Sequence, residues 1–243
     1  MIKDWFKKKN EITFYCSQQD RAIYDVLKPG YAANFMPDWY KNLPTTYKRK
    51  NEFNLEFESP TVRSCHGIKE TIRNGFIFPM WCDFIIEIDP DRSYRYQFSD
   101  AEKGLMEHNR VQYHGLFEDS IIIKFKNPWI AKTSRPASFY ATQPLYHIGS
   151  IPEFFISPGF ISFNERITNS LSVFIIFPVK PHTQRIMIPV GFPLMQLIST
   201  ENCFWHIKTE CISQDVHDSY AQLNRLSFLK VHDKLNSLRK TNE

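Results

Sequence analysis

The chain has 243 residues, of which 42% are hydrophobic and 15% aromatic, so it can bury a large core and general disorder is excluded. Its net charge is only +4, and the short basic clusters at 7–9 and 48–50 are typical of a solvated surface. It contains no basic motif interleaved with aromatic residues, so we do not expect it to bind nucleic acid.

The cysteine content favours a reducing compartment. The five cysteines are odd in number and include no C-x-x-C pair, so they indicate neither a disulfide framework nor a thiolate zinc site. Residues 1–9 lack the apolar core of a signal peptide, and the longest apolar run, 171–179, is too short to cross a bilayer. We therefore expect a cytoplasmic protein with no membrane partner.

The N-terminal part, 1–59, is expected to add a strap and two short elements to a larger domain. Residues 11–16 have the composition of a strand, and 19–27 of a helix. The aromatic and proline-rich residues 34–44 favour a hydrophobic strap over regular structure. The polar residues 45–59 are the best candidate for a flexible loop.

Residues 60–213 have the pattern of a β domain. After a one-turn helix at 67–74, strands are expected at 76–88 and 94–98, joined by a turn at 89–92. Further short strands, separated by proline and glycine, are expected at 120–125, 130–143 with a bend at 135–138, 158–164, 171–178 and 186–198. Short strands at this spacing predict a mainly β fold, an antiparallel β-barrel or sandwich.

The last part, 214–243, changes to helical spacing. Apolar residues there recur three or four positions apart among polar ones, and Arg239 and Lys240 stand near the end, where cations favour a helix C-terminus. We predict a C-terminal α-helix that packs on the β domain or mediates self-association.

Four ordered segments of the chain carry a resemblance to other sequences. At 36–44, 74–83, 127–129 and 188–196 the chain is similar to an uncharacterised family of tailed-bacteriophage and marine viral proteins. The resemblance implies a viral context, with the protein in the host cytoplasm or in the virion. It implies no particular biochemistry.

A second resemblance concerns the residues 159–164 and 188–198. With the strand between them, they are similar in order and spacing to motifs of the trimeric dUTPase and dCTP deaminase β-barrels. The bend at 135–138 lies where those enzymes contact phosphate. This resemblance implies a dUTPase-like, β-clip barrel, a nucleotide ligand and a homotrimer; a cupin-like jelly roll is the alternative fold.

The departures from that second family speak against its chemistry. Ser162 stands where the family has its catalytic aspartate, and a hydroxyl cannot serve as that base near neutral pH. Phe192 and Pro193 replace the Asp-Arg of the closing motif, and a helix replaces the glycine-rich arm. No catalytic residue is therefore assigned, and whether the protein is an enzyme stays open.

The bend and the motif that follows it supply candidate ligand-binding residues. Arg135 and Ser138 together could hold phosphate oxygens, although a plain surface turn is the alternative. Ser162 and Asn164 form a polar pair in an apolar block and are candidates for the same site.

Two further candidates lie in apolar strands. Gln196 needs hydrogen-bond partners if it is buried, and it would either read a base edge or, as we favour, satisfy a neighbouring backbone. Asp83 also needs a partner if it is buried, and Arg135 is one candidate.

Metal and thiol chemistry are less favoured by the pattern. His108 and His114 stand near Glu107, but they do not have the spacing of a two-histidine, one-carboxylate cupin site, and no metal or other cofactor is assigned. Cys82 has no histidine paired with it by sequence, so we expect a buried structural cysteine.

These observations favour a phage-type accessory protein that binds a nucleotide or other phosphorylated small molecule without dUTPase catalysis. The alternatives are a virion structural or assembly protein, whose aromatic faces and terminal helix make subunit contacts, and a cupin-like metalloenzyme.

Overall fold

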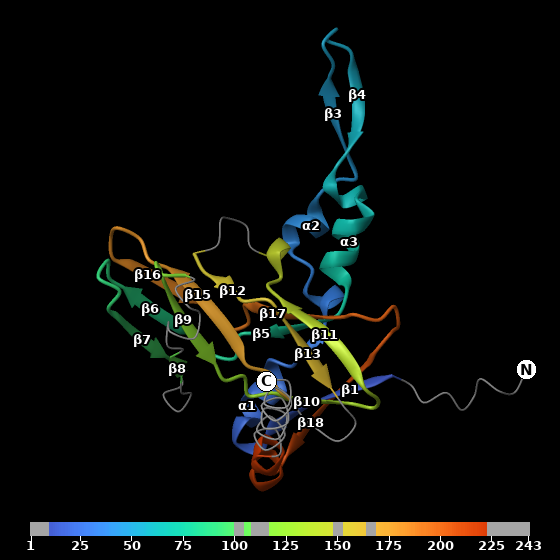
Figure 1. Ribbon diagram of the computed structural model, residues 1–243. Helices are drawn as coiled ribbons and strands as arrows, with labels where there is room; N and C mark the ends of the chain where they lie inside the picture. Colours follow the sequence, from blue (N-terminus) through green and yellow to red (C-terminus); the bar gives the residue numbers. More distant parts are fainter. Residues whose placement is uncertain (1–9, 100–104, 108–116, 148–152, 164–168, 223–243) are drawn as a thin grey trace, which may run out of the picture.

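A computed structural model describes residues 10–99, 105–107, 117–147, 153–163 and 169–222 (Figure 1). About twice as many residues lie in strands as in helices, which confirms the predicted mainly β class. No helix within those ranges is both long enough and apolar enough to cross a membrane.

The largest sheet has five antiparallel strands. Their order is β13 (Gly159–Phe163), β11 (Ala137–Thr142), β17 (Pro193–Ser199), β5 (Phe76–Pro79) and β2 (Gly30–Tyr31). The strand predicted at 186–198 is in fact two strands, because Gly191 turns the chain with a φ of 80°.

A four-stranded sheet incorporates the first strand of the chain. Its order is β14 (Asn169–Ser170), β10 (Ile130–Thr133), β1 (Glu11–Ser17) and β18 (His206–Ile212). β1 is antiparallel to β10 but parallel to β18, an exception to the predicted antiparallel pairing. The strand predicted at 11–16 is therefore confirmed and lies inside a sheet.

Two further sheets, both antiparallel, complete the main part of the molecule. We call the four larger sheets together the body. One has the order β12 (Phe155–Ile156), β15 (Val173–Pro178), β9 (Ser120–Phe125) and β8 (Leu105–Glu107). The other has the order β16 (Gln184–Ile188), β6 (Phe84–Ile88) and β7 (Tyr94–Phe98). β6 and β7 are joined by the predicted turn, in which the Asp89 carbonyl accepts from the Arg92 amide.

The sheets of the body share one hydrophobic core. Phe14, Phe84, Phe125 and Phe139 are all fully buried, although they come from four different strands, one in each of the four sheets. Phe84 and Phe125 meet edge to face with ring centroids 4.7 Å apart, a favourable aromatic geometry. No sheet among the described strands closes on itself, so the choice between barrel and sandwich stays a prediction.

The helices are short. They are η2 (Gln18–Asp20), α1 (Arg21–Val26), η3 (Ala32–Phe35), α2 (Asp38–Asn42), η4 (Val62–Ser64), α3 (His66–Arg73), η6 (Leu145–His147) and a helix over 214–222. The helices predicted near 19–27 and 67–74 are confirmed. The C-terminal helix begins at 214 as predicted, and the rest of its predicted length lies outside the described residues.

The prediction of a flexible loop at 45–59 was wrong. β3 (Thr46–Lys50) and β4 (Glu56–Pro60) form an antiparallel hairpin that projects from the body (Figure 1). We call this hairpin the arm. Both strands are almost wholly exposed, so no buried apolar face marks them in the sequence, and the turn sets their register.

The strap predicted at 34–44 was also wrong in detail, because these residues form the end of η3 and the whole of α2. Tyr40 of α2 is buried, and its hydroxyl donates to the Arg63 carbonyl at the foot of the arm. We call the arm, α2 and α3 together the arm column.

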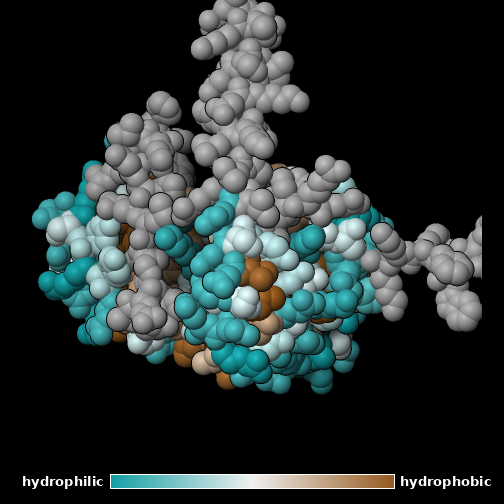
Figure 2. Space-filling model, turned by 90° about the horizontal axis from the view of Figure 1, so that it is seen from below, coloured by the Kyte–Doolittle hydropathy of each residue, from teal (hydrophilic) through white to brown (hydrophobic). Residues whose placement is uncertain are grey.

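The body face turned away from the arm is mostly hydrophilic, with a small apolar patch (Figure 2).

Candidate ligand-binding site

The structure brings two of the six predicted ligand-binding residues together. Ser138 on β11 lies directly opposite Ser162 on β13, and their hydroxyl oxygens are 3.1 Å apart. Asn164 lies outside the described residues. The pair is a cross-strand hydroxyl contact of the kind that stabilises a sheet.

Arg135 forms an ion pair with Glu201, an acid that the sequence did not indicate as its partner. Its guanidinium forms a bidentate pair with Glu201, and its Nε donates to the Asn10 Oδ1 at 2.7 Å. Trp205 lies beneath the guanidinium, 4.9 Å from ring centroid to Cζ. Hydrogen bonding to Arg135 lowers the pKa of Glu201, and hydrogen bonding to Glu201 raises the pKa of Arg135. Arg135 therefore links β11 to the segment before β18.

Asp83 forms its hydrogen bonds with Val190 and Ser99. Its Oδ1 accepts from the Val190 amide at 2.8 Å, and its own amide donates to the Ser99 hydroxyl. The expected pairing with Arg135 is replaced by these backbone and hydroxyl contacts. Asp83 thereby fixes the turn between β16 and β17 against β6.

Gln196 caps the end of α3. The side chain is 2% exposed, and its Nε2 donates to the Thr71 carbonyl at 2.8 Å and to the Asn74 carbonyl at 2.6 Å. The favoured interpretation, a buried amide that satisfies a neighbouring backbone, is confirmed. Since the last carbonyls of a helix have no partner within it, this contact fixes where α3 ends on the body.

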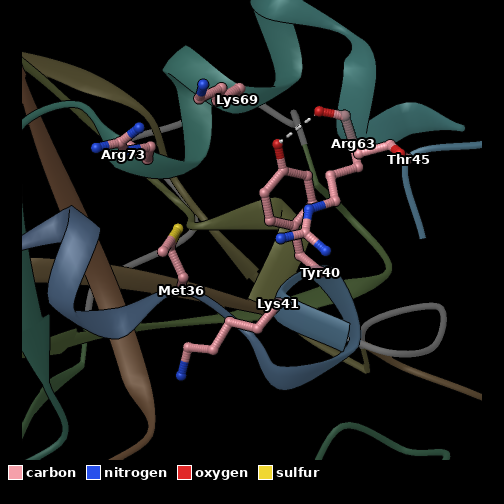
Figure 3. A pocket seen from close by; sticks show the side chains of 7 residues that line it. All are labelled: Met36, Tyr40, Lys41, Thr45, Arg63, Lys69 and Arg73. Atoms are coloured by element: carbon pink, nitrogen blue, oxygen red, sulfur yellow. Dashed lines mark hydrogen bonds between the residues drawn. The ribbon is translucent and has the colours of Figure 1, made fainter. Parts of the chain in front are cut away.

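A cavity of about 330 Å³ lies beside α3, at the foot of the arm (Figure 3). Its lining consists of Met36, Tyr40, Lys41, Thr45, Arg63, Lys69 and Arg73. Four of these seven residues are cations and none is an acid. We call it the basic cavity.

Three separate elements supply the cations of the basic cavity. Lys41 comes from α2, Arg63 from η4, and Lys69 and Arg73 from α3, with Met36 between the α2 and α3 sides (Figure 3). Lys69 and Arg73 are four residues apart and so lie on the same face of the helix. The fold, rather than a local motif, concentrates this charge.

The four cations differ in how they are engaged. Lys41 pairs with Asp38 at 3.1 Å, and the Arg63 Nη1 donates to the Leu43 carbonyl at 2.6 Å. Within the described part of the chain, the side chains of Lys69 and Arg73 make no hydrogen bond or ion pair. Lys41 and Arg63 therefore already have partners, and the side chains of Lys69 and Arg73 remain available to a ligand in the cavity.

A second cavity, of about 470 Å³, adjoins the first through Arg73. Aromatic residues dominate it: Tyr31 and Phe204 stack with ring centroids 5.6 Å apart, and Phe76 and Trp205 also line it. We call it the aromatic cavity. Its lining also includes the polar residues Asn34, Glu70, Arg73 and Asn74.

Sequence reasoning missed the basic cavity. The spacing of Lys69 and Arg73 in a predicted helix was a usable signal, because such a pair shares a helix face. Lys41 and Arg63 gave no such signal, since only the packing of α2 against η4 brings them together.

The metal and thiol hypotheses gain no support. Among the described residues no group of three or more His, Cys, Asp or Glu could hold a metal ion, and His108 and His114 lie outside those residues. Cys82 is buried, as predicted.

Comparison of the chain with protein-family models, curated proteins and solved structures finds no match in any of the three.

Proposed function

We propose that this protein binds a phosphorylated small molecule in the basic cavity. The observation that carries the proposal is the convergence of Lys41, Arg63, Lys69 and Arg73 on one cavity whose lining contains no acid. Arginine and lysine are the residues that bind phosphate oxygens, arginine through its fork of donors and lysine as a point charge.

An anion would relieve the repulsion between two of these cations. Like charges four residues apart destabilise a helix by about 0.2–0.5 kcal/mol, and Lys69 and Arg73 are such a pair. A phosphoryl group between them converts this repulsion into charge-assisted hydrogen bonds. The cavity volume is near the lower end of the range for small-molecule sites, roughly 300–1,000 Å³.

A small ligand fits these observations better than a nucleic acid. On the arm above the cavity, Lys48 lies opposite Glu58 and Lys50 opposite Glu56, so two of the three cations of the arm are matched by acids, and the third, Arg49, lies over the Phe57 ring. No continuous basic track leads away from the cavity along the arm. Nucleotides and sugar phosphates both satisfy the charge requirement.

The proposal assigns binding and no catalysis. Its setting, an accessory protein of a phage with a barrel- or sandwich-type β domain, is supported by the sequence resemblances and by the core that the four sheets share. The site itself belongs to the arm column and does not depend on that resemblance.

The test is a binding panel of inorganic phosphate, a sugar phosphate and a nucleoside triphosphate, followed by thermal shift and calorimetry. At least one phosphate ester should raise the melting temperature in proportion to its concentration. Lys69→Gln and Arg73→Gln should each weaken its affinity about tenfold, because each removes a charge-assisted contact.

The matched control is Lys126→Gln, which removes the same charge at an exposed position outside the cavity. It should leave affinity unchanged. The proposal fails if no member of the panel shifts the melting curve, or if the control weakens binding as much as the cavity variants.

A further inference from the structure

The tip of the arm is an ordered turn that exposes two apolar side chains, Phe53 and Leu55. We call these two side chains the knob. The Asn51 side chain accepts from the amides of Phe53 and Leu55 at 3.0 and 2.9 Å, and Asn54 adopts a left-handed φ of 64°. This turn holds Phe53 and Leu55 outward, with 73% and 64% of their surface exposed. An ordered turn that presents two large apolar side chains to water is a recognition feature rather than a solvated loop tip.

The foot of the arm is clamped as firmly as its tip. Thr61 Oγ1 donates to the Pro44 carbonyl at 2.5 Å, and the Thr61 amide and Ser64 hydroxyl both donate to the Thr45 carbonyl. An isolated two-stranded hairpin is marginally stable in water, so these contacts are what keep the arm aligned with α3. The knob therefore has a defined position relative to the rest of the chain.

The aromatic cavity has the size and chemistry to accept such a knob. A cavity of roughly 150 Å³ holds a benzene ring, and this one measures about 470 Å³. Phe204 on its wall is 65% exposed, and Tyr31 and Trp205 offer further ring faces for an entering phenyl group. The lining carries one cation, Arg73, and one acid, Glu70, so Arg73 is the residue that can pair with Glu52, which precedes Phe53.

Knob and cavity lie at opposite ends of the arm column. β4 leads through η4 into α3, and α3 ends at the cavity (Figure 1). Five residues of strand and eight of helix separate them by roughly 30 Å. A chain cannot place its own knob in its own cavity.

We propose that copies of this chain associate head to tail, with Phe53 of one copy seated in the aromatic cavity of the next. The contact uses two different surfaces, so it is heterologous and produces a closed ring or an open filament rather than a two-fold dimer. This proposal concerns a different cavity from the proposed phosphate site, although Arg73 lines both cavities.

The charge pattern of the arm argues against a symmetric contact, in which two copies pair the same edge strand of their arms. An antiparallel pairing of two β3 strands sets lysines against lysines or Arg49, and a pairing of two β4 strands brings the glutamates together. Charged edge residues are a known device against such pairing. Insertion of the tip avoids both repulsions.

The first test is sedimentation velocity over a range of concentrations. The wild-type chain should form oligomers larger than dimers, and Phe53→Asp should weaken association at least about tenfold, as expected for a central aromatic anchor. Phe160→Asp is the matched control, because Phe160 is an equally exposed phenylalanine, at 71%, on β13 of the body. The proposal is overturned if the wild type stays monomeric at all concentrations or if both variants behave alike.

The second test separates head-to-tail from symmetric contacts. Phe53→Asp retains the cavity, and Phe204→Asp retains the knob; each alone should be monomeric. Mixed in equal amounts, they should form a heterodimer and nothing larger, because one intact knob meets one intact cavity. A mixture that stays monomeric, or oligomers in either variant alone, would overturn the head-to-tail arrangement.

Discussion

Different interactions stabilise the body and the arm column. The body is built on buried aromatic residues: Phe84 is 0% exposed and contacts rings of its own sheet and of a second sheet. The arm leaves Phe53 at 73% exposed and takes its shape from the Asn51 turn and the Thr61 clamp. Apolar burial therefore specifies the body, and short-range polar contacts specify the arm column, which carries the exposed tip residues and borders both cavities.

The largest expected difference is between one phenylalanine of each region. Phe84→Ala should lower the free energy of unfolding by about 3–5 kcal/mol, because it leaves a cavity in the core between its own sheet and the sheet that carries Phe125 and Phe177. Phe57→Ala on the arm should cost no more than about 1 kcal/mol, mainly its contact with Arg49. Urea denaturation at low protein concentration measures both, and equal losses would contradict the distinction between the regions.

The junction between the regions depends on one glycine. Gly75 has a φ of 77°, and a Cβ there would lie 1.8 Å from the Leu197 carbonyl oxygen on β17. Gly75→Ala should therefore destabilise the chain by more than about 2 kcal/mol, from left-handed backbone strain and the clash together.

Gly67 provides the control for that substitution. It lies in α3, and a Cβ there would meet nothing within 4 Å. Gly67→Ala should stabilise the chain by about 0.5–1 kcal/mol, since alanine is the better helix former. Should both substitutions destabilise to the same extent, close packing of α3 onto β17 would not be the reason for Gly75.

Gln196 couples the body to the basic cavity. Gln196→Leu preserves the size of the side chain but leaves the Thr71 and Asn74 carbonyls without their donor, at a cost of about 1–3 kcal/mol. Since these carbonyls end α3, the substitution should also weaken phosphate binding through Lys69 and Arg73. Gln97→Leu, at an exposed position on β7, should alter neither. Loss of stability without loss of affinity would show that α3 keeps its position unaided.

The same contrast explains what the sequence could predict. Runs such as 120–125 and 173–178 are apolar because both faces are buried, so their strands were visible in composition alone. The arm carries charge on one face and mixed residues on the other, and its register comes from Asn51, so it resembled a loop. Gln196 was correctly recognised as a buried amide with a structural role, but its partners on α3 could not be seen without the fold.

The smallest expected effect concerns the contact between the arm column and the body near η6. His147 Nε2 donates to the Phe35 carbonyl at 2.6 Å, and the Trp39 indole donates to the Tyr146 carbonyl at 2.8 Å. Burial lowers the pKa of His147, against the opposing influence of the Phe35 and Pro144 carbonyls. In the unfolded chain the imidazole titrates near its ordinary value of about 6.5, so between the two pKa values the unfolded state binds more protons.

The contribution of neutral His147 to stability is therefore fully present above about pH 6.5 and is lost as the pH falls towards its folded-state pKa. We expect the free energy of unfolding to decrease over that interval, and His147→Gln to reduce the slope. His182→Gln, at an exposed histidine on the body, should leave the slope unchanged. If the slope survives in His147→Gln, other groups carry the acid sensitivity, and the contact at η6 joins the two regions without responding to pH.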